Sequence, residues 1–293
     1  MEDEDGRVTA RRKNARSHRT ENNVASRGQG PDFIEALARG LDVLRSFSPD
    51  RPSMSLSQVA AAADLARPTA RRILLTLAEL GYVRSSDGGH TLTPRVLELG
   101  MAYVGSLGLW DLARPHLEEL VAQTGESSSM AQLDGSDIVY VARVAVPKLI
   151  GLRVDIGTRF PAIATSQGKV LLAALDDADA LAVLAEPSRS SLAVPTPPAD
   201  DVLAALSEIR RRGWAAADQE LAPGVRSIAV PVADGHGIVR ATMNVTVHAA
   251  ETSLDALIGR HLPALQDAAA RTSADWARWQ NRPIETAERR ARA

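Results

Sequence analysis

Hydrophobic residues recur at helical spacing in two short runs between Leu56 and Val83. The first run has the spacing of one short helix, with apolar residues at Leu56, Val59 and Ala60. The chain then breaks at residues 63–66 before a second apolar stripe begins, formed by Ile73, Leu74, Leu77 and Leu80. This pattern predicts two short helices joined by a tight turn, which is the layout of a helix-turn-helix.

The second of these helices carries the polar residues that are free to meet a partner. Pro68 suits the first helical turn, where its missing N–H has no intrahelical partner, and Gly81 suits the end of the helix. Three arginines open the helix, mainly off the apolar stripe. We expect contacts with double-stranded DNA from Ser57, Arg67, Pro68, Thr69, Arg71, Arg72 and Arg84. The alternative is a plain helical hairpin whose arginines are only solvated.

Two short β-prone segments follow this helix. Tyr82–Arg84 and His90–Leu92 are joined by Ser85–Gly89, whose Asp-Gly and Gly-Gly steps are typical of a hairpin turn. Upstream, Phe33–Phe47 predicts a first helix with an apolar face at Ile34, Leu37, Ala38, Leu41 and Leu44. Together these elements predict a winged helix-turn-helix domain over residues 31–94.

Charged segments with few large apolar residues lie at both ends of the chain. Residues 1–30 and 283–293 are expected to be disordered tails, and the alternative for the first is a basic arm on the DNA backbone. After the wing, residues 95–108 predict a linker helix with exposed apolar residues, at Val96, Leu97, Leu99, Tyr103 and Val104. Exposed apolar residues on a linker indicate a partner, so a homodimer is the minimum expected assembly and a tetramer on DNA the larger one.

Helical and strand patterns alternate over residues 109–282. The expected helices are Leu112–Thr124, one within Pro161–Leu175, Asp179–Ala185, Asp200–Arg212 and Leu254–Trp279. The expected strands are Ser128–Leu133, Ile138–Val146, Trp214–Gln219, Ser227–Val232 and Val239–Val247. Helices with an antiparallel sheet in this order predict an α+β sensor domain.

Composition limits the classes of protein that fit. The chain has 293 residues and 45% hydrophobic residues, enough for two cores, while its net charge of −2 requires any DNA contact to come from a local basic cluster. The absence of cysteine excludes disulfides, cysteine-based zinc sites and thiol catalysis, and no metal or cofactor is expected. Apolar runs such as Val170–Leu175 are too short to span a bilayer, and the charged N-terminus has no signal-peptide core. We therefore expect a cytoplasmic protein with no membrane partner.

Two segments of the second domain predict loops over a cavity. In Pro161–Lys169, hydroxylated residues lie at a helix N-terminus led by Thr165 or Ser166, where free backbone N–H groups favour a carboxylate or phosphate. In the other segment, 218–232, a polar loop leads into a buried strand. The residues expected to face one space there are Asp218, Glu220 and Ser227.

Two polar residues on a later strand are expected to face the same space. Asn244 and Thr246 are two apart on that strand and therefore share a face. Each residue picked out around this space also has an ordinary structural reading as the alternative: a helix cap, a turn residue or a satisfied buried amide.

The chain carries no recognised catalytic motif. It lacks GxSxG, HExxH and a P-loop, the run 235–237 is an incomplete GxGxxG, and its six histidines are scattered. An enzyme with a helix-turn-helix appendage is the less favoured alternative to a regulator. A constitutive DNA-binding protein without a ligand is a third reading, and the long second domain argues against it.

Four motifs in order closely resemble the IclR family of bacterial transcriptional regulators. They are ARGLDVLRSF, LSQVAAAADLARPTARRILLTLAELGYV, TSQGKVLLA and GWAAADQELAPGVRSIAVPV, and the match covers Phe33 to about Trp279. Within the family, DFIEALARGLDVL, PTARRILLTL, DQELAPGVRSIAVPV and MNVTVHA look most like the branch of PcaR, PcaU and PobR type. That branch controls aromatic-acid breakdown through the β-ketoadipate route.

The resemblance implies an N-terminal winged helix, a linker helix and a C-terminal GAF-like α/β domain that binds a small organic acid. In this branch the acid would be an aromatic carboxylate such as protocatechuate or 4-hydroxybenzoate, or β-ketoadipate; a different small organic acid is the alternative. The family's effector pocket would fall on Leu149, Leu152, Phe160, Ser166, Gln167, Asp218, Ser227, Asn244 and Thr246. Some members have cysteine where Ser227 stands and different small residues at Ser166 and Gln167, so these positions are expected to set ligand choice.

Overall fold

The chain divides into two compact units, residues 1–96 and 97–293. The computed structural model describes residues 30–86, 88–100, 108–147 and 154–281. The division falls inside the predicted linker, of which residues 97–100 are helical and 101–107 lie outside the described residues. The predicted tails also lie outside them, apart from residue 30.

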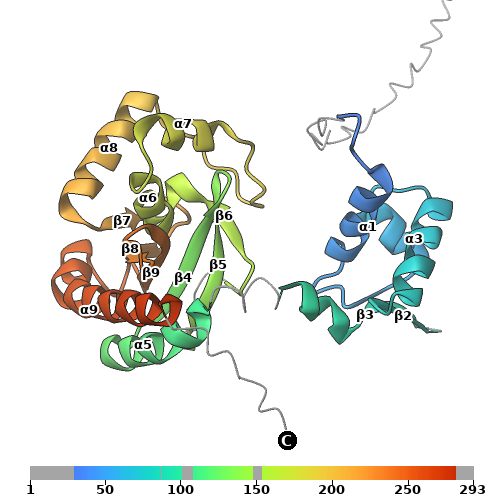
Figure 1. The fold of residues 1–293 in the computed structure, drawn as a ribbon, viewed down its shortest axis with the longest axis horizontal. Coiled ribbons are helices and arrows are strands. Elements are labelled where there is room, and N and C mark those ends of the chain that lie inside the picture. Colours follow the sequence, from blue (N-terminus) through green and yellow to red (C-terminus); the bar gives the residue numbers. More distant parts are fainter. Residues whose placement is uncertain (1–29, 87, 101–107, 148–153, 282–293) are drawn as a thin grey trace, which may run out of the picture. The chain divides into compact units, whose positions relative to one another are not determined.

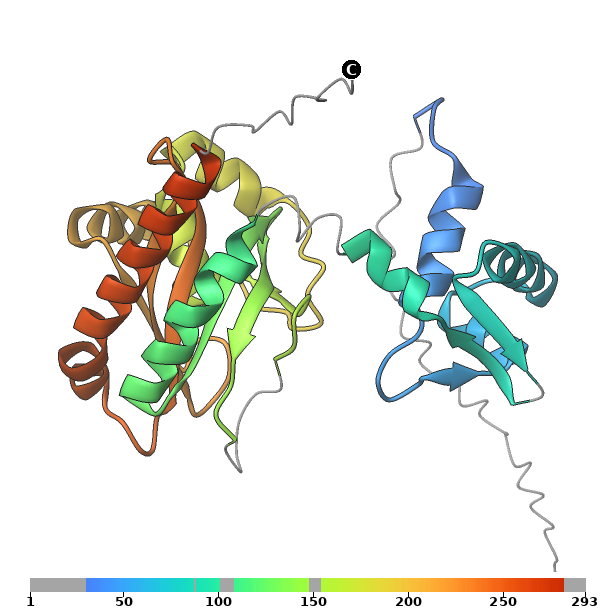
Figure 2. The ribbon, with the colours of Figure 1, turned by 60° about the horizontal axis from the view of Figure 1, so that its bottom comes forward.

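The N-terminal unit is a winged helix-turn-helix, as predicted (Figure 2). Its helices are α1 (Glu35–Arg45), α2 (Leu56–Ala62) and α3 (Arg67–Glu79). Its strands are β1 (Ser53–Met54), β2 (Val83–Ser86) and β3 (Gly89–Leu92), in the antiparallel order β1-β3-β2. The wing strands run closer to the turn than the sequence indicated, and β1, only two residues long, was not predicted.

Local chemistry explains where the reader helices begin and end. Ser55 caps α2 in a reciprocal capping box with Gln58. Asp64 takes the left-handed conformation, with φ of +51°, in the turn between α2 and α3, which an Asp tolerates better than a branched residue. Pro68 lies in the first turn of α3, and Gly81, with φ of +81°, follows its end.

The predicted apolar face of α1 is wrong for most of its length. Ile34, Leu37 and Leu41 are 65%, 61% and 47% exposed, while Val43 and Phe47 are buried. The small core of this unit reaches only the C-terminal end of the helix, so the earlier turns are left outside it. The predicted stripe of α3 also needs one correction, because Leu80 is 51% exposed and Ala70 is buried.

The C-terminal unit is built on one six-stranded antiparallel sheet in the order β6-β5-β4-β9-β8-β7 (Figure 1). The strands are β4 (Ser127–Asp134), β5 (Asp137–Val144), β6 (Arg159–Pro161), β7 (Ala215–Asp218), β8 (Val225–Ala233) and β9 (Val239–His248). The helices are α5 (Leu109–Thr124), α6 (Ser166–Ala173), α7 (Asp177–Ala185), α8 (Ala199–Arg212) and α9 (Leu254–Gln280). All five expected helices and all five expected strands are present; β6 and the short 3₁₀ helices η1 (Pro94–Val96) and η2 (Ala162–Ala164) were not predicted.

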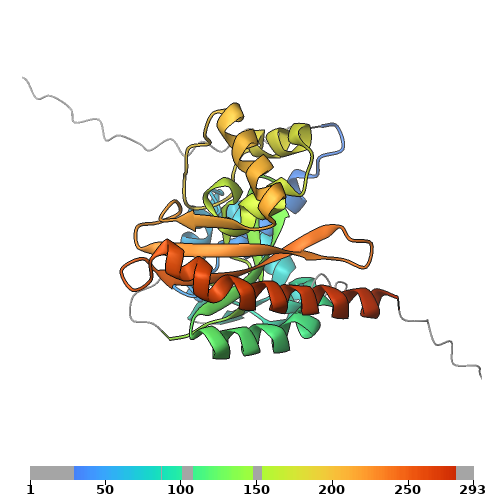
Figure 3. The ribbon, with the colours of Figure 1, turned by 90° about the vertical axis from the view of Figure 1, so that its left-hand side faces the viewer.

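The two faces of this sheet are covered by different helices. Helices α5 and α9 lie side by side along one face, while α6, α7 and α8 lie on the other (Figures 1 and 3). The α5/α9 face forms an apolar core around Leu117, Met243 and Leu265. The opposite face forms a second core around Ile138, Leu172 and Leu206. No helix in the described ranges is both long and apolar enough to cross a membrane.

Candidate functional site

The arginines predicted to read DNA lie on the surface of the N-terminal unit. Arg67, Arg71 and Arg72 on α3 and Arg84 on β2 are exposed. None of the four forms an ion pair or side-chain hydrogen bond with a described residue. Among the other residues predicted to contact DNA, Ser57 and Pro68 are exposed and Thr69 is half-buried.

The start of α3 is open to an anion. Its N-cap residue, Ala66, has no side-chain oxygen to bond the first backbone N–H groups, and the first turn holds no acidic residue. Free N–H groups and the positive end of the helix dipole both attract phosphate oxygens. The geometry therefore combines exposed arginines with an uncapped helix N-terminus, which suits a nucleic-acid backbone.

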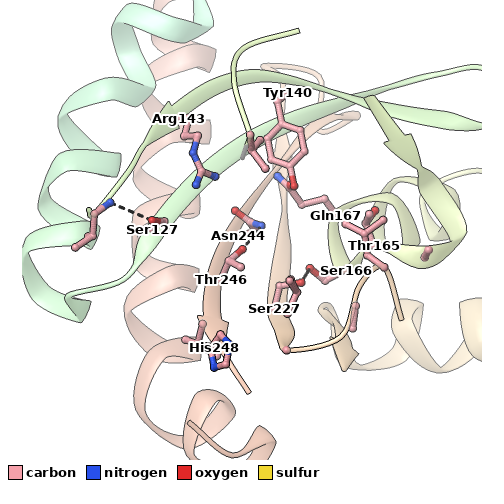
Figure 4. Close-up of a pocket in the computed structure, with 18 of the residues that line it drawn as sticks. Ser127, Tyr140, Arg143, Thr165, Ser166, Gln167, Ser227, Asn244, Thr246 and His248 are labelled. Carbon is pink, nitrogen blue, oxygen red and sulfur yellow. Dashed lines mark hydrogen bonds between the residues drawn. The ribbon is translucent and has the colours of Figure 1, made fainter. Parts of the chain in front are cut away.

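In the C-terminal unit, a cavity of about 310 Å³ lies between the sheet and the N-terminus of α6 (Figure 4). Its walls come from β4, β5, β7, β8 and β9 as well as from α6. Five of the residues predicted for the effector pocket line it, namely Ser166, Gln167, Ser227, Asn244 and Thr246. The fold thus brings together residues that are up to 80 positions apart in the chain.

Strand alternation gives this cavity a polar wall. On β9, Asn244, Thr246 and His248 line the cavity, whereas Met243 and Val245, the residues before and after Asn244, belong to the core under α5 and α9. Successive side chains of a strand point to opposite faces, so one strand supplies both an apolar core and a polar surface. The prediction that Asn244 and Thr246 share a face is confirmed.

Most polar groups of this wall are already hydrogen-bonded to one another. The hydroxyls of Ser166 and Ser227 lie 2.8 Å apart. The Asn244 side chain accepts from the backbone N–H of Ser129 at 3.0 Å and donates to the Thr246 hydroxyl at 3.0 Å. These bonds hold the side chains in fixed orientations, as a preformed binding site requires.

The N-terminus of α6 is fixed by a side-chain cap and by a close backbone approach. The Thr165 hydroxyl accepts from the Gly168 N–H at 2.9 Å, which confirms Thr165 as the N-cap. A Cβ at Gly168 would lie 2.2 Å from the Ala162 carbonyl oxygen, so no larger residue fits there. Gln167 is buried; its Nε2 donates to the carbonyls of Ser129 and Thr242, while its Oε1 has no hydrogen-bond partner.

Two residues predicted for the pocket do not line the cavity. Asp218 is out of phase with Ala217, which faces the cavity, and instead forms an ion pair with Arg226 at 2.7 Å. The Arg226 hydrogen bond holds the pKa of the Asp218 carboxyl below its usual range. Phe160 packs in the core, edge-to-face against Tyr140.

One further residue picked out from the sequence, Glu220, also falls outside the lining. Glu220 is paired with Lys169 at 2.6 Å instead of facing the cavity. Leu149 and Leu152 lie outside the described residues.

Two residues of β5, which the sequence analysis did not predict, also line the cavity. Tyr140 and Arg143 are three positions apart, which in a regular strand would put them on opposite faces. The pairing with β4 shows a bulge at Val141, because Ala131 pairs with Tyr140 and the adjacent Met130 with Ala142. The extra residue reverses the alternation, so both side chains reach the cavity (Figure 4). The only signal for them was an arginine in the otherwise uncharged run Ile138–Val146.

The burial of these two side chains changes their acid–base properties. Burial raises the pKa of the Tyr140 hydroxyl to about 12, so the group is a neutral hydrogen-bond donor. Burial lowers the pKa of the Arg143 guanidinium, with Tyr140 and Asp155 acting in the opposite direction. Arg143 still carries its charge and, among the described residues, donates one hydrogen bond, to the Ser129 hydroxyl at 3.0 Å.

A winged helix-turn-helix with a basic reader helix, joined in one chain to an α/β unit with a polar cavity, defines a DNA-binding regulator with a ligand-binding domain. Comparison with known protein families places it further. The IclR helix-turn-helix domain matches residues 36–87, and the family described as "Bacterial transcriptional regulator IclR C-terminal" matches residues 101–274. The chain belongs to the IclR family of transcriptional regulators.

Individual relatives agree with this assignment. The Pca regulon regulatory protein of Pseudomonas putida is 39% identical over 239 residues, which cover 80% of this chain and 81% of that protein. The p-hydroxybenzoate hydroxylase transcriptional activator of Acinetobacter baylyi is 34% identical, covering 81% of this chain and 90% of that protein. A crystal structure from Rhodococcus sp. RHA1, described as a transcriptional regulator, is 44% identical with a TM-score of 0.73, covering 84% of this chain and all of that one.

These relatives are transcriptional regulators and not enzymes, and the chain is likewise an IclR-type regulator of the Pca/PobR kind. The alternative of an enzyme with a helix-turn-helix appendage is therefore set aside.

Proposed function

We propose that the cavity binds an aromatic carboxylic acid as the effector and that this acid controls operator binding by α3. The single observation that carries the proposal is the cavity itself, with its polar wall of Ser166, Ser227, Asn244 and Thr246 and with Arg143 in its lining. A volume of about 310 Å³ suits a single substituted ring. The relatives named for the Pca regulon and for p-hydroxybenzoate hydroxylase support an acid of this class.

On the DNA side, we infer that Arg67, Arg71, Arg72 and Arg84, with Ser57, Pro68 and Thr69, form the contact surface. Their exposure and lack of internal partners support this role. We also infer that the protein works as a homodimer, with a tetramer as the larger assembly on DNA. The exposed apolar residues Leu37 and Leu41 on α1, with Ile34 just before it, support a partner at that surface. Because its partner is operator DNA, we expect the protein to act in the cytoplasm.

Ligand binding by the full chain tests the effector. We expect 4-hydroxybenzoate or protocatechuate to raise the unfolding temperature and to change the affinity for an operator selected from random-sequence DNA. Ser227→Phe fills the cavity and should abolish both effects while circular dichroism shows an intact fold. Ser207→Phe places the same side chain at an exposed position of α8 and should leave both effects unchanged.

Two results would contradict the proposal. One is a native chain that no aromatic acid stabilises. The other is equal ligand binding by the Ser227→Phe variant and the native chain.

A further inference from the structure

The part of the cavity wall that the structure describes contains one fixed charge. Among the described residues that line it, Arg143 is the sole arginine or lysine, and no aspartate or glutamate is present. The other polar groups are hydroxyls, amides and the imidazole of His248. A ligand that neutralises this wall therefore needs one negative charge and not two.

The Arg143 guanidinium has N–H groups without a hydrogen-bond partner among the described residues. It is half-buried, has one hydrogen bond, to the Ser129 hydroxyl, and forms no ion pair within 4 Å with a described residue. Asp155, the carboxylate that acts on it electrostatically, is itself exposed. A guanidinium has five N–H groups, and a partly buried charge without a close partner costs free energy that a bound carboxylate recovers.

Tyr140 adds a second hydrogen-bond donor to the cavity wall formed by β5. Its side chain projects from β5 toward Asn244, as that of Arg143 does (Figure 4). Its hydroxyl forms no hydrogen bond with a described residue. The bulge at Val141 thus places a neutral hydroxyl donor and a guanidinium on one wall of the cavity.

The wall at α6 is less suited to an anion. The Ser166 and Ser227 hydroxyls bond each other, and the Thr165 hydroxyl bonds the Gly168 N–H. Gln167 adds an unpaired acceptor oxygen nearby, because turning its amide over would set that oxygen against two carbonyls. An unpaired acceptor favours a donor and repels a carboxylate.

We propose that Arg143, together with the Tyr140 hydroxyl, binds the carboxylate of the effector, and that the effector is a monoanion whose uncharged end faces α6. This inference rests on the proposed function, and it assigns the carboxylate to β5 instead of to the helix N-terminus expected from the sequence. It makes Arg143 the residue that selects for an acid and Tyr140 an assisting donor.

Calorimetric titration of the full chain with three compounds of one shape tests the charge selection. The probes are 4-hydroxybenzoate, its neutral counterpart 4-hydroxybenzamide, and the dianion terephthalate. We expect the native chain to bind 4-hydroxybenzoate about 10- to 100-fold more tightly than the amide, and to bind terephthalate more weakly than 4-hydroxybenzoate.

Variants then assign the effect to residues. Arg143→Gln should lose about 10- to 100-fold in affinity for 4-hydroxybenzoate and leave the affinity for the amide unchanged, and Arg143→Lys should recover part of the loss. Tyr140→Phe should lose about fivefold for the acid. Arg240→Gln, at an exposed arginine on β9 that is paired with Asp234, is the matched control and should bind like the native chain.

The outcomes separate this inference from the proposed function. If the native chain binds 4-hydroxybenzoate and Arg143→Gln binds it equally well, the carboxylate is not at Arg143 and the proposed function stands. Terephthalate binding as tightly as 4-hydroxybenzoate would overturn the monoanion assignment. If the native chain binds none of the three probes, both the aromatic-acid effector and this inference are wrong.

Discussion

The reader helix α3 and the cavity both present arginine to a partner, but they hold it in opposite surroundings. Arg67, Arg71 and Arg72 are exposed on α3, where water screens each charge. Arg143 is half-buried on β5 beside a buried tyrosine, where a charge interacts more strongly with its partner. The comparison teaches that the first site suits a long polyanion bound by many weak contacts, and the second a small anion bound by one strong contact.

The largest effect is expected from breaking the cavity while leaving the reader intact. Gly168→Ala places a Cβ 2.2 Å from the Ala162 carbonyl oxygen, so α6 must move away from η2. We expect the C-terminal unit to lose about 3 kcal/mol of stability. Denaturation followed by tryptophan fluorescence measures this unit alone, because all four tryptophans lie beyond residue 108.

Gly259→Ala is the matched control for this variant. Gly259 lies within α9, and the space that a Cβ would occupy there is open, so alanine should raise stability by up to about 1 kcal/mol. A Gly168→Ala protein as stable as the native chain would show that the close approach of α6 and η2 is not required.

The next effect sharpens the reader side of the comparison. Arg71→Ala or Arg72→Ala should weaken operator binding by about 1–3 kcal/mol if the residue reads a base through two hydrogen bonds. If the residue instead contacts a phosphate, its loss should weaken binding to all DNA sequences alike. The slope of log affinity against log salt concentration should then become shallower by about one. Gel-shift titration at several salt concentrations separates these cases, and affinity for the aromatic acid should stay constant in both.

Arg211→Ala is the control for the reader variants. Arg211 is also an exposed helical arginine, but it lies on α8 and is paired with Glu208. Its removal should leave operator binding unchanged. Native affinity in both reader variants would argue against α3 as the DNA-contacting helix.

The smallest effect concerns acid sensitivity of the C-terminal unit. Asp275 on α9 accepts hydrogen bonds from His116 on α5, at 2.8 Å, and from Arg278, and these lower the pKa of its carboxyl. A lowered folded pKa means that the stabilisation is present above the ordinary value of about 4 and is lost as the pH falls through the folded value. Asp275→Asn should therefore cost about 0.5–1 kcal/mol at pH 6 and progressively less below pH 4.

Urea denaturation at pH 6 and at pH 3, followed by tryptophan fluorescence, measures this difference. Asp267→Asn changes a more exposed carboxylate on the same helix and should have a smaller effect. If Asp275→Asn lowers the free energy of unfolding equally at both pH values, the hydrogen bonds of Asp275 do not contribute to the acid sensitivity.

Much of the fold was predictable because its signals are local. The 3.6-residue spacing of Leu74 and Leu77, Pro68 at the start and Gly81 at the end were enough to place α3. The Thr165 cap and the shared face of Asn244 and Thr246 are local for the same reason. Periodicity alone did not reveal that the early turns of α1 stay exposed, because exposure depends on how far the small core extends.

The sequence by itself determined most of the helices and strands, the reader helix and five residues on the cavity wall, because helix and strand periods place side chains relative to their neighbours in the chain. Only the tertiary structure decided which polar residues meet. The Val141 bulge brought Tyr140 and Arg143 to one face, and the phase of β7 turned Asp218 away toward Arg226. Strand register and a one-residue bulge are fixed by pairing with distant strands, so no local pattern records them.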